Sequence, residues 1–461
     1  MSKNLLCKAV FSAVGAGLSG EGVPCRPVLS AETVTPMKLE PYWLATAPRF
    51  AGGTIGPLAG KVDVAIVGGG FTGLSAALAL AKSGASVAVL EAGRVIGEAS
   101  GRNGGHCNNG LAHDLGSLAA SLGEERAVAL YRAFDNAVDT VEALVAREAI
   151  DCDFIRTGKI KLAAKPEHFA KLEKSAALLR RTVEPDLAVV SPSEIRREIG
   201  TDGFFGGLVY PRSAHMHMGR FGVGLAEAAV RGGVAIHENA AVTGLRRLNG
   251  QAHRVVTSRG TLEAGQVLLA TGASRQGPFA WLRRRIVPVG SFIIATEPLS
   301  PERAAAILPK RRTATTTKNI GNYFRLTPDN RLIFGGRARF ALSSPASDAK
   351  SGAILKARML ELFPELADTR IDYCWGGLVD MTADRLPRAG ERDGVFYALG
   401  YSGHGTQMSV HMGQAMAKVM GGDVKENPFA GLGWPAVPGH FGPPWFLPFV
   451  GMYYRYQDWR H

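Results

Sequence analysis

Several features that would place a chain outside the ordinary globular proteins are missing from this sequence. The five cysteines are an odd number and show no CxxC spacing, which argues against a disulfide framework or a zinc site and indicates a reducing compartment. No apolar run reaches the roughly 18–20 residues needed to span a bilayer, and no repeat of about 20–50 residues indicates a solenoid. No cluster of metal-ligating residues is recognisable. These absences predict a globular, cytoplasmic protein without a metal site.

Positive charge is in excess but is not concentrated anywhere. The chain has 53 Lys and Arg against 40 Asp and Glu, a formal net charge of +13. Its densest basic clusters, Arg283–Arg285 and Lys310–Arg312, are only three residues long, and no aromatic-rich basic stretch accompanies them. We therefore expect a solvated basic surface and no nucleic-acid partner.

The first 36 residues carry a weak pattern of their own. Lys3 and Lys8 precede a mildly apolar stretch that faintly resembles a signal peptide, but Gly15 and Gly17 interrupt it. Met37 opens Met-Lys-Leu-Glu-Pro-Tyr-Trp, which resembles a natural start. We predict that residues 1–36 form a disordered extension.

Glycine, in contrast, is abundant, with 57 residues, and one glycine cluster has an informative context. Residues 62–67 are an apolar run typical of a buried strand, and Gly68-Gly-Gly-Phe-Thr-Gly73 follows directly. A helical pattern over 74–81 leads to a second strand, residues 87–90, which ends at Glu91. Strand, glycine turn, helix, strand and acid within about 30 residues predict a dinucleotide-binding βαβ unit.

Each member of this unit has a physical role. Gly68 allows the tight turn, Gly70 admits a pyrophosphate close to the helix N-terminus, and Gly73 lets helix and strand pack closely. Glu91, 18 residues after Gly73, can accept hydrogen bonds from the adenosine ribose and would repel a 2′-phosphate, which disfavours NADP. The same pattern at Gly15–Gly20 is followed by prolines and by no second strand and acid, so we interpret it as coincidence.

Two further segments favour FAD over NAD. The small residues of Gly97–Gly105 would let a cofactor extend along the chain, with Arg102 and Asn103 in reach of phosphate or flavin atoms. More than 300 residues after the fingerprint, Gly400-Tyr-Ser-Gly-His-Gly405 separates a strand from a helix, so its N–H groups can point at the flavin N1–O2 edge. Positive potential there stabilises the reduced, anionic flavin, and an NAD enzyme needs no such distant element.

These segments and others along the chain carry a family resemblance. They are Tyr42-Trp43, Val64–Gly73, Glu91, Ala99–Gly105, Ala270–Gly272, Gly335-Gly336, Trp375–Gly377, Asp380–Asp384, Pro387 and Gly400–Gly405. On these residues the sequence resembles the D-amino-acid-oxidase-like superfamily of FAD-dependent oxidoreductases, also called the glycine/sarcosine oxidase group. Within it, the sequence is most similar to the γ-glutamylputrescine oxidase-like proteins, over residues 40–455.

The resemblance implies an α/β fold: a discontinuous, Rossmann-like FAD-binding domain with an inserted α+β substrate domain that contains a mixed sheet. We assign residues 37–116, 206–280 and 374–425 to the FAD-binding domain, and residues 117–205 and 281–373 to the substrate domain. Residues 426–461, rich in proline, glycine and aromatics, are expected to form an irregular C-terminal tail.

The expected FAD-binding residues combine the fingerprint, the two glycine-rich segments and positions that the resemblance implies. The resemblance places the backbone of Val242 against the adenine. It aligns Asn103, not His106, with the histidine that some relatives link to the flavin, so we expect His106 to be a non-covalent neighbour; Cys374 is expected to be buried structure. The full set is Gly68, Gly69, Gly70, Phe71, Thr72, Gly73, Glu91, Ala92, Ser100, Arg102, Asn103, Gly104, Val242, Gly272, Gly400, Gly403, His404, Gly405 and Thr406.

Four residues are candidates for catalysis and substrate binding. His404, between two glycines, is placed to contact the flavin, and Trp375 could contact the reacting atoms or wall the substrate pocket. Tyr323 and Arg337 are candidates for substrate binding, since arginine is the natural partner of a substrate carboxylate.

Together these residues predict FAD-dependent oxidation of a C–N bond in a small amine or amino acid. Hydride would pass to flavin N5 and the resulting imine would be hydrolysed to an aldehyde or keto acid, with oxygen as the expected acceptor. Two alternatives stay open: a flavin dehydrogenase that passes electrons to a quinone or another carrier, and a non-catalytic FAD-binding subunit. The apolar segment Gly442–Val450 could touch a membrane, but docking on the protein's own sheet is the simpler interpretation.

Overall fold

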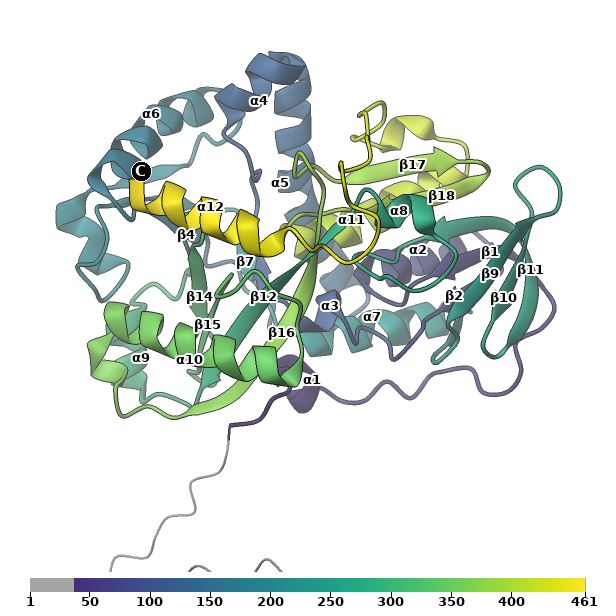
Figure 1. The fold of residues 1–461 in the computed structure, drawn as a ribbon, viewed down its shortest axis with the longest axis horizontal. Coiled ribbons are helices and arrows are strands. Elements are labelled where there is room, and N and C mark those ends of the chain that lie inside the picture. The colour runs from purple at the N-terminus through teal and green to yellow at the C-terminus, as the bar shows by residue number, and fades with distance from the viewer. Residues whose placement is uncertain (1–36, 461) are drawn as a thin grey trace, which may run out of the picture. The chain divides into compact units, whose positions relative to one another are not determined.

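Two eight-stranded sheets organise residues 37–460, the part of the chain that the computed structural model describes (Figure 1). The predicted disordered extension, residues 1–36, lies outside the described residues. Within the described part, no helix is both long enough and apolar enough to cross a membrane.

The first sheet contains the predicted βαβ unit. Its main path runs β17 (Arg388–Arg392), β18 (Val395–Leu399), β11 (Gly260–Leu269), β1 (Lys61–Val67), β2 (Val87–Leu90) and β8 (Ala235–His237), and β10 (His253–Thr257) and β9 (Val242–Arg247) join it beside β11. The strands from β18 to β8 are parallel. β1 is apolar along its buried half because both faces of a parallel sheet are covered.

Helices on this sheet pack closely at glycines. They are α2 (Phe71–Lys82), α7 (Met218–Arg231), α11 (Gly405–Met420) and, against α11, α5 (Glu124–Arg147). A Cβ on Gly413 would lie 2.5 Å from the carbonyl oxygen of Thr72, so only glycine permits the approach of α11 to α2. The helical region expected over 117–150 is two helices, because Gly123, at φ 85°, ends α4 (Leu115–Leu122) before α5 begins.

The second sheet is mixed, as predicted. Its order is β16 (Ile371–Met381), β12 (Val287–Thr296), β15 (Leu332–Gly336), β14 (Asn322–Leu326), β13 (Thr313–Thr316), β4 (Lys159–Leu162), β6 (Gly207–Tyr210) and β5 (Ala188–Val190). Only the β13–β4 pair is parallel. Helix α10 (Pro345–Leu362) packs on β12, β15 and β16, and α6 (Pro166–Thr182) packs on β6. Helix α9 (Pro301–Ile307) lies beside α10 (Figure 1).

Short elements complete the chain. They are α1 (Tyr42–Thr46), α3 (Ala99–Arg102), α8 (Ala280–Arg283), the two-stranded pair β3 (His106–Cys107) and β7 (Ala214–His215), and the 3-10 turns Pro192–Arg197, Pro364–Leu366 and Val424–Glu426.

Sheet membership differs from the predicted domain limits at two points. Gly207–Tyr210 pairs with β4 and β5 in the second sheet, although residues 206–280 were assigned to the FAD-binding domain. β16 stays paired with β12 as far as Met381, beyond the predicted limit at 374. The division into two domains stays a prediction. Because Gly207–Tyr210 and β16 belong to the second sheet, we would now assign both to the substrate domain.

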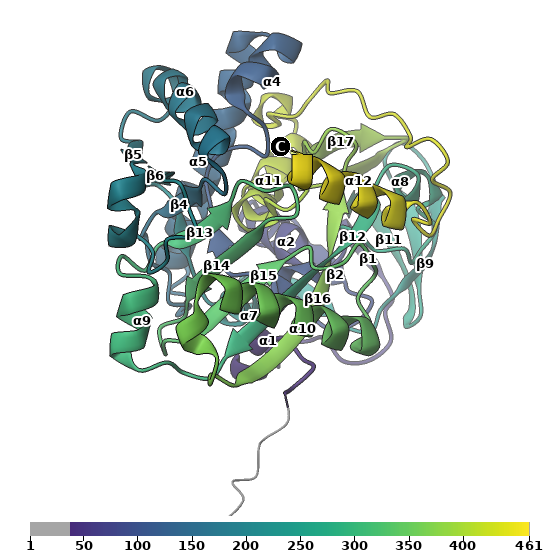
Figure 2. The ribbon, with the colours of Figure 1, turned by 60° about the vertical axis from the view of Figure 1, so that its left-hand side comes forward.

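The C-terminal tail is not irregular throughout, as the sequence suggested, because residues Leu447–Arg460 form α12 (Figure 2). Pro448 stands in the first turn, where its missing N–H breaks no helical hydrogen bond. A Cβ on Gly451 would lie 2.8 Å from the ring of Phe340, which shows how closely the helix docks. Near the other end, the Asp458 carboxylate accepts the backbone N–H of Asn319 at 2.8 Å. These contacts stabilise a helix that local composition disfavours.

Candidate active site

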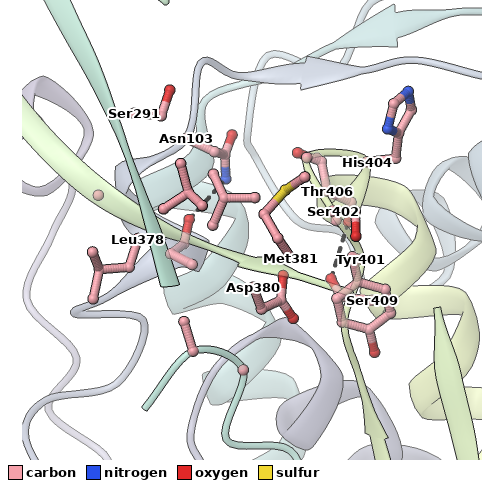
Figure 3. Close-up of a pocket in the computed structure, with 18 of the residues that line it drawn as sticks. Asn103, Ser291, Leu378, Asp380, Met381, Tyr401, Ser402, His404, Thr406 and Ser409 are labelled. Carbon is pink, nitrogen blue, oxygen red and sulfur yellow. Dashed lines mark hydrogen bonds between the residues drawn. The ribbon is translucent and has the colours of Figure 1, made fainter. Parts of the chain in front are cut away.

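A large cavity, of about 1430 Å³, is lined by residues of both sheets, and Figure 3 shows part of it. It begins at the carboxyl ends of β1 and β2 and extends to β4, β14 and α12. Ligand pockets are typically about 300–1,000 Å³, so this cavity has room for a large cofactor and a second molecule. The carboxyl ends of parallel strands are where open α/β sheets bind their ligands.

The glycine turn after β1 has the geometry that a pyrophosphate needs. Gly68 has φ 114°, and a Cβ on it would lie 2.5 Å from the carbonyl oxygen of Ala270. A Cβ on Gly73 would lie only 2.0 Å from the oxygen of Gly68, so α2 and β1 can meet only with glycine there. Gly70, the N-cap residue of α2, has no side chain to cap the helix and lines the cavity itself, while the hydroxyl of Ser100 accepts the N–H of Phe71 at 3.0 Å. The helix N-terminus keeps further N–H groups for an anion.

Glu91 is held rigidly at the end of β2. One carboxylate oxygen accepts the N–H of Gly69 at 2.7 Å and the other accepts the N–H of Gly93 at 2.8 Å. Burial raises the pKa of Glu91, and these two N–H groups oppose that rise. Each oxygen keeps a further lone pair for a ribose hydroxyl, so the arrangement fits the adenosine half of a dinucleotide.

The 99–105 segment lies along the same cavity, where hydrogen bonds between side chains and backbone groups hold it. Asn103 accepts the N–H of Gly105 at 2.9 Å, and the indole of Trp43 donates to its carbonyl oxygen at 2.6 Å. Arg102 donates to the carbonyl oxygens of Gly97 at 2.8 Å and Gly376 at 3.1 Å. Arg102 and Asn103 thus shape the cavity wall, and three of the five donors of Arg102 stay free for a ligand.

The 400–405 segment reaches the cavity from the opposite end of the chain. The carboxylate of Asp380 accepts the N–H of Gly400 at 2.6 Å, and burial raises its pKa to about 6. Left-handed backbone at Gly400, Ser402 and Gly403 turns the chain into α11, whose N-terminus has no side-chain cap. Figure 3 shows Asp380 and Met381 beside Tyr401 and Ser402 of this loop and Thr406 at the start of α11.

All predicted FAD-binding residues line the cavity except Gly69, Gly73 and Gly400. Those three lie behind the cavity wall. Gly69 donates its N–H to Glu91, Gly73 allows α2 to pack on β1, and Gly400 donates its N–H to Asp380. The hydroxyl of Tyr401, 2.8 Å from the Thr72 hydroxyl, joins the 400–405 loop to α2. The donors at two helix N-termini, the carboxylate of Glu91 and the glycine cradle together fit FAD.

His404 lies at the boundary between the cofactor end and the second sheet. Its ring packs edge-on against Phe134, with centroids 6.0 Å apart, and its Nδ1 has no hydrogen-bond partner among the described residues. Burial, and after it the charge of neighbouring cations, lowers the pKa of His404 to about 3. Those cations are Lys159, Lys161, Arg337 and Arg385. The ring is therefore neutral at ordinary pH and stands in a positive potential.

Tyr323 and Arg337 line the cavity as predicted. The Tyr323 hydroxyl is 3.0 Å from the Ser291 hydroxyl, and burial raises its pKa to about 12. Arg337 makes no hydrogen bond or ion pair within residues 37–460, and burial lowers its pKa. A desolvated guanidinium without an internal partner is suited to an anionic ligand.

Known proteins match the chain over most of its length. The sequence profile of the DAO family, described as FAD dependent oxidoreductase, matches residues 63–419. The chain belongs to this family. It is 32% identical over 425 residues to gamma-glutamylputrescine oxidoreductase of Escherichia coli (strain K12), an alignment that covers 90% of this chain and 97% of that protein. It is 27% identical to glycine oxidase of Geobacillus kaustophilus (strain HTA426), with 80% and 95% covered.

The fold agrees with this membership. The crystal structure of glycine oxidase from Geobacillus kaustophilus superposes with a TM-score of 0.65 at 24% identity, covering 78% of this chain and 95% of that one. The predictions of family, fold class and cofactor are thereby confirmed, and this FAD-dependent oxidoreductase is an enzyme of the type that acts on amines and amino acids.

Trp375 requires a correction. The structure places its ring in the hydrophobic core of the oxidoreductase, 1% exposed and not on the cavity wall. Its indole N–H donates to the carbonyl oxygen of Arg102 at 2.9 Å. Trp375 therefore supports the 99–105 segment from behind the cavity wall, and its predicted place in the substrate pocket is not where the structure puts it. Cys374 is buried on the other face of β16, with its sulfur 3.2 Å from the carbonyl oxygen of Asp348.

Sequence reasoning missed three cations of this oxidoreductase. Lys159 and Lys161 line the cavity from β4. Arg325, 1% exposed, donates to the carbonyl oxygens of Gly104 at 3.2 Å and Met216 at 2.8 Å, and so secures the turn after α3. The Lys-Ile-Lys-Leu alternation at 159–162 was the available signal, because it puts both lysines on one face of a strand.

Proposed function

We propose that this oxidoreductase oxidises the C–N bond of an amine or amino acid and that oxygen reoxidises the cofactor. The observation that carries the proposal is the continuity of the cavity. The dinucleotide cradle at one end opens directly onto a wall that holds the neutral His404, the half-buried Tyr323 and Arg337, which has no partner within residues 37–460. The names of the two relatives, a γ-glutamylputrescine oxidoreductase and a glycine oxidase, support the same class of substrate.

FAD, which the Gly68–Gly73 turn, Glu91 and the 400–405 segment would hold, would supply the two-electron acceptor for oxidation of the C–N bond to an imine, which water would hydrolyse to an aldehyde or keto acid. The protein's own residues prepare the substrate. Arg337 binds a carboxylate of the substrate and orients it. The positive potential around His404 lowers the pKa of a bound ammonium, which favours the neutral amine that the reaction requires.

Helix α12 closes the substrate end of the cavity. Phe446, Leu447, Val450 and Tyr454 face it, and Leu447 packs with Val287 and Val289 of β12. This apolar wall excludes bulk water, which strengthens the electrostatic contacts inside.

The decisive experiment is anaerobic mixing of the FAD-loaded enzyme with primary amines, N-acylated diamines, amino acids and N-methyl amino acids. We expect at least one class to bleach the visible flavin band. Arg337→Met should raise KM for carboxylated substrates by about ten- to hundredfold, the loss of one charge-assisted contact. Arg339→Met, two residues further and off the cavity wall, is the matched control. A flavin that no compound bleaches would instead support a non-catalytic FAD-binding subunit.

A second candidate differs in the electron acceptor. The outward face of the C-terminal segment carries large apolar side chains, among them Trp445 (66% exposed), Phe449 (60%) and Trp459 (79%). Such a face favours a dehydrogenase that meets a membrane-borne quinone. Replacing these three residues by serine should abolish vesicle co-sedimentation and quinone reduction if this candidate holds, and should leave oxygen consumption unchanged if oxygen is the acceptor.

A further inference from the structure

Two lysines of β4 face the cavity of this oxidoreductase, outside the residues assigned above to cofactor or substrate. The strand alternates strictly: Ile160 and Leu162 are fully buried in the second hydrophobic core, and Lys159 and Lys161 point the other way and line the cavity. In the mechanism proposed above, both lysines contribute to the positive potential around His404, but neither binds the substrate. Their surroundings, however, are quite different.

Lys159 is satisfied by the protein. Its ammonium donates to the carbonyl oxygen of Asn109 and lies 4.3 Å from the ring centroid of Tyr210. Burial lowers the pKa of Lys159 to about 8, and the buried carboxylates of Glu184 and Asp135 oppose that fall. Both carboxylates accept hydrogen bonds from the Asn109 amide. Lys159 therefore belongs to an internal polar network.

Lys161 has no such partner. It makes no hydrogen bond and no ion pair within residues 37–460, while burial lowers its pKa. The one carboxylate that acts on it electrostatically is Asp114, which is exposed and already accepts from Ser117 at 3.0 Å and Ser175 at 2.9 Å. A partly desolvated ammonium without a partner is costly unless a ligand supplies the anion.

The register of the second sheet gives the distance scale. Tyr323 of β14 stands opposite Thr315 of β13, which stands opposite Lys161 of β4. Neighbouring strands are about 4.8 Å apart, so Lys161 lies roughly 10 Å across the sheet from Tyr323. All three residues line the same cavity. An elongated small molecule of about 10 Å could therefore contact Lys161 and Tyr323 at the same time.

We propose that Lys161 binds a carboxylate at the far end of an elongated amine, whose reacting C–N bond lies at the Tyr323 and His404 end of the cavity. The inference rests on the proposed function and assigns to Lys161 the selection of amines that carry a distant carboxylate. An amine that spans roughly the 10 Å between Tyr323 and Lys161 has the required length and charge. The hydroxyl of Thr315, beside Lys161 in the sheet, is a further donor for the carboxylate.

The test compares two amines of equal length with the FAD-loaded enzyme, one ending in a carboxylate and one in the uncharged primary amide. We expect kcat/KM for the carboxylate to be about ten- to hundredfold higher, as for one charge-assisted contact. Lys161→Met should remove that preference by lowering only the carboxylate's value, and Lys161→Arg should restore most of it. Lys174→Met, at an exposed lysine of α6 that is not on the cavity wall, is the matched control. Flavin content and melting temperature report whether each variant folds.

Different outcomes separate this inference from the proposed function. If no amine or amino acid bleaches the flavin, the proposed function fails. If both amines are oxidised equally well, the enzyme is an amine oxidoreductase and Lys161 has no role in selecting the substrate. If the preference survives Lys161→Met but is lost in a variant of Lys318, an exposed lysine on the cavity rim, the carboxylate binds there and the inference is overturned.

Discussion

Gly70 and Gly73 lie in one turn, but an added methyl group should affect two different properties. A Cβ on Gly70 would lie 2.9 Å from the hydroxyl of Ser100, the mobile end of a short side chain, and would project into the phosphate cradle. A Cβ on Gly73 would lie 2.0 Å from the backbone oxygen of Gly68. Regaining a C···O distance of about 3.3 Å requires α2 and β1 to separate by roughly 1.3 Å.

Gly73→Ala should therefore destabilise the protein by about 3 kcal/mol or more, the upper range for overpacking in a rigid site. Gly70→Ala should cost the apoprotein only about 1 kcal/mol, because moving the Ser100 hydroxyl deprives the Phe71 N–H of its acceptor. The FAD affinity of that variant should fall by about ten- to hundredfold, as for one lost hydrogen bond to a phosphate.

Urea unfolding of the apoproteins measures the first quantity, and quenching of FAD fluorescence on titration measures the second. Gly433→Ala is the control, since a Cβ there meets nothing within 4 Å. A Gly70→Ala protein that binds FAD as tightly as the parent would refute the placement of the pyrophosphate at this turn.

Three further changes test other parts of the site. Glu91→Gln puts an amide NH₂ against one of two backbone N–H groups, so the Kd for FAD should rise about ten- to hundredfold; an unchanged Kd would contradict the ribose role. Trp375→Phe leaves the buried Arg102 carbonyl oxygen without its donor and should cost about 1–2 kcal/mol in urea unfolding with KM unchanged, whereas a raised KM would return Trp375 to the substrate pocket. Burial, then the Glu184 charge, raises the pKa of Asp135 to about 7, so its stabilising effect is present at acid pH and lost as pH rises through 7. Asp135→Asn should flatten the fall in unfolding free energy between about pH 4 and 7, from the ordinary pKa of an aspartate to the raised one.

Local patterns were sufficient for the βαβ unit. The strand at 87–90, the helix ending before Gly84 and the acid at Glu91 were all found where the sequence predicted them, because each boundary has its own chemical signal. The meeting of the 99–105 and 400–405 segments in one cavity was predicted from cofactor chemistry and family resemblance, since no local pattern joins residues 300 positions apart.

The misses have a common physical cause. Helix α12 depends on tertiary partners such as Phe340 and Asn319, which local composition does not reveal. Trp375 lies on the same face of β16 as the cavity-lining Gly377, two residues along the strand, but α3 covers this part of the strand and accepts the indole N–H at the carbonyl oxygen of Arg102. Which part of a strand borders a cavity depends on tertiary packing. Packing likewise decides which face of β4 borders the cavity, so Lys161 was missed although the alternation of β4 was visible in the sequence.

Anaerobic reduction of the bound FAD tests the central claim most directly. The FAD-loaded enzyme is mixed without oxygen with amines and amino acids, and the visible flavin absorbance is followed before and after air is admitted. We predict bleaching by at least one amine or amino acid, recovery of the flavin band on aeration, and release of the matching aldehyde or keto acid. A flavin that stays oxidised with every compound would contradict the assignment of an amine-oxidising active site to this cavity.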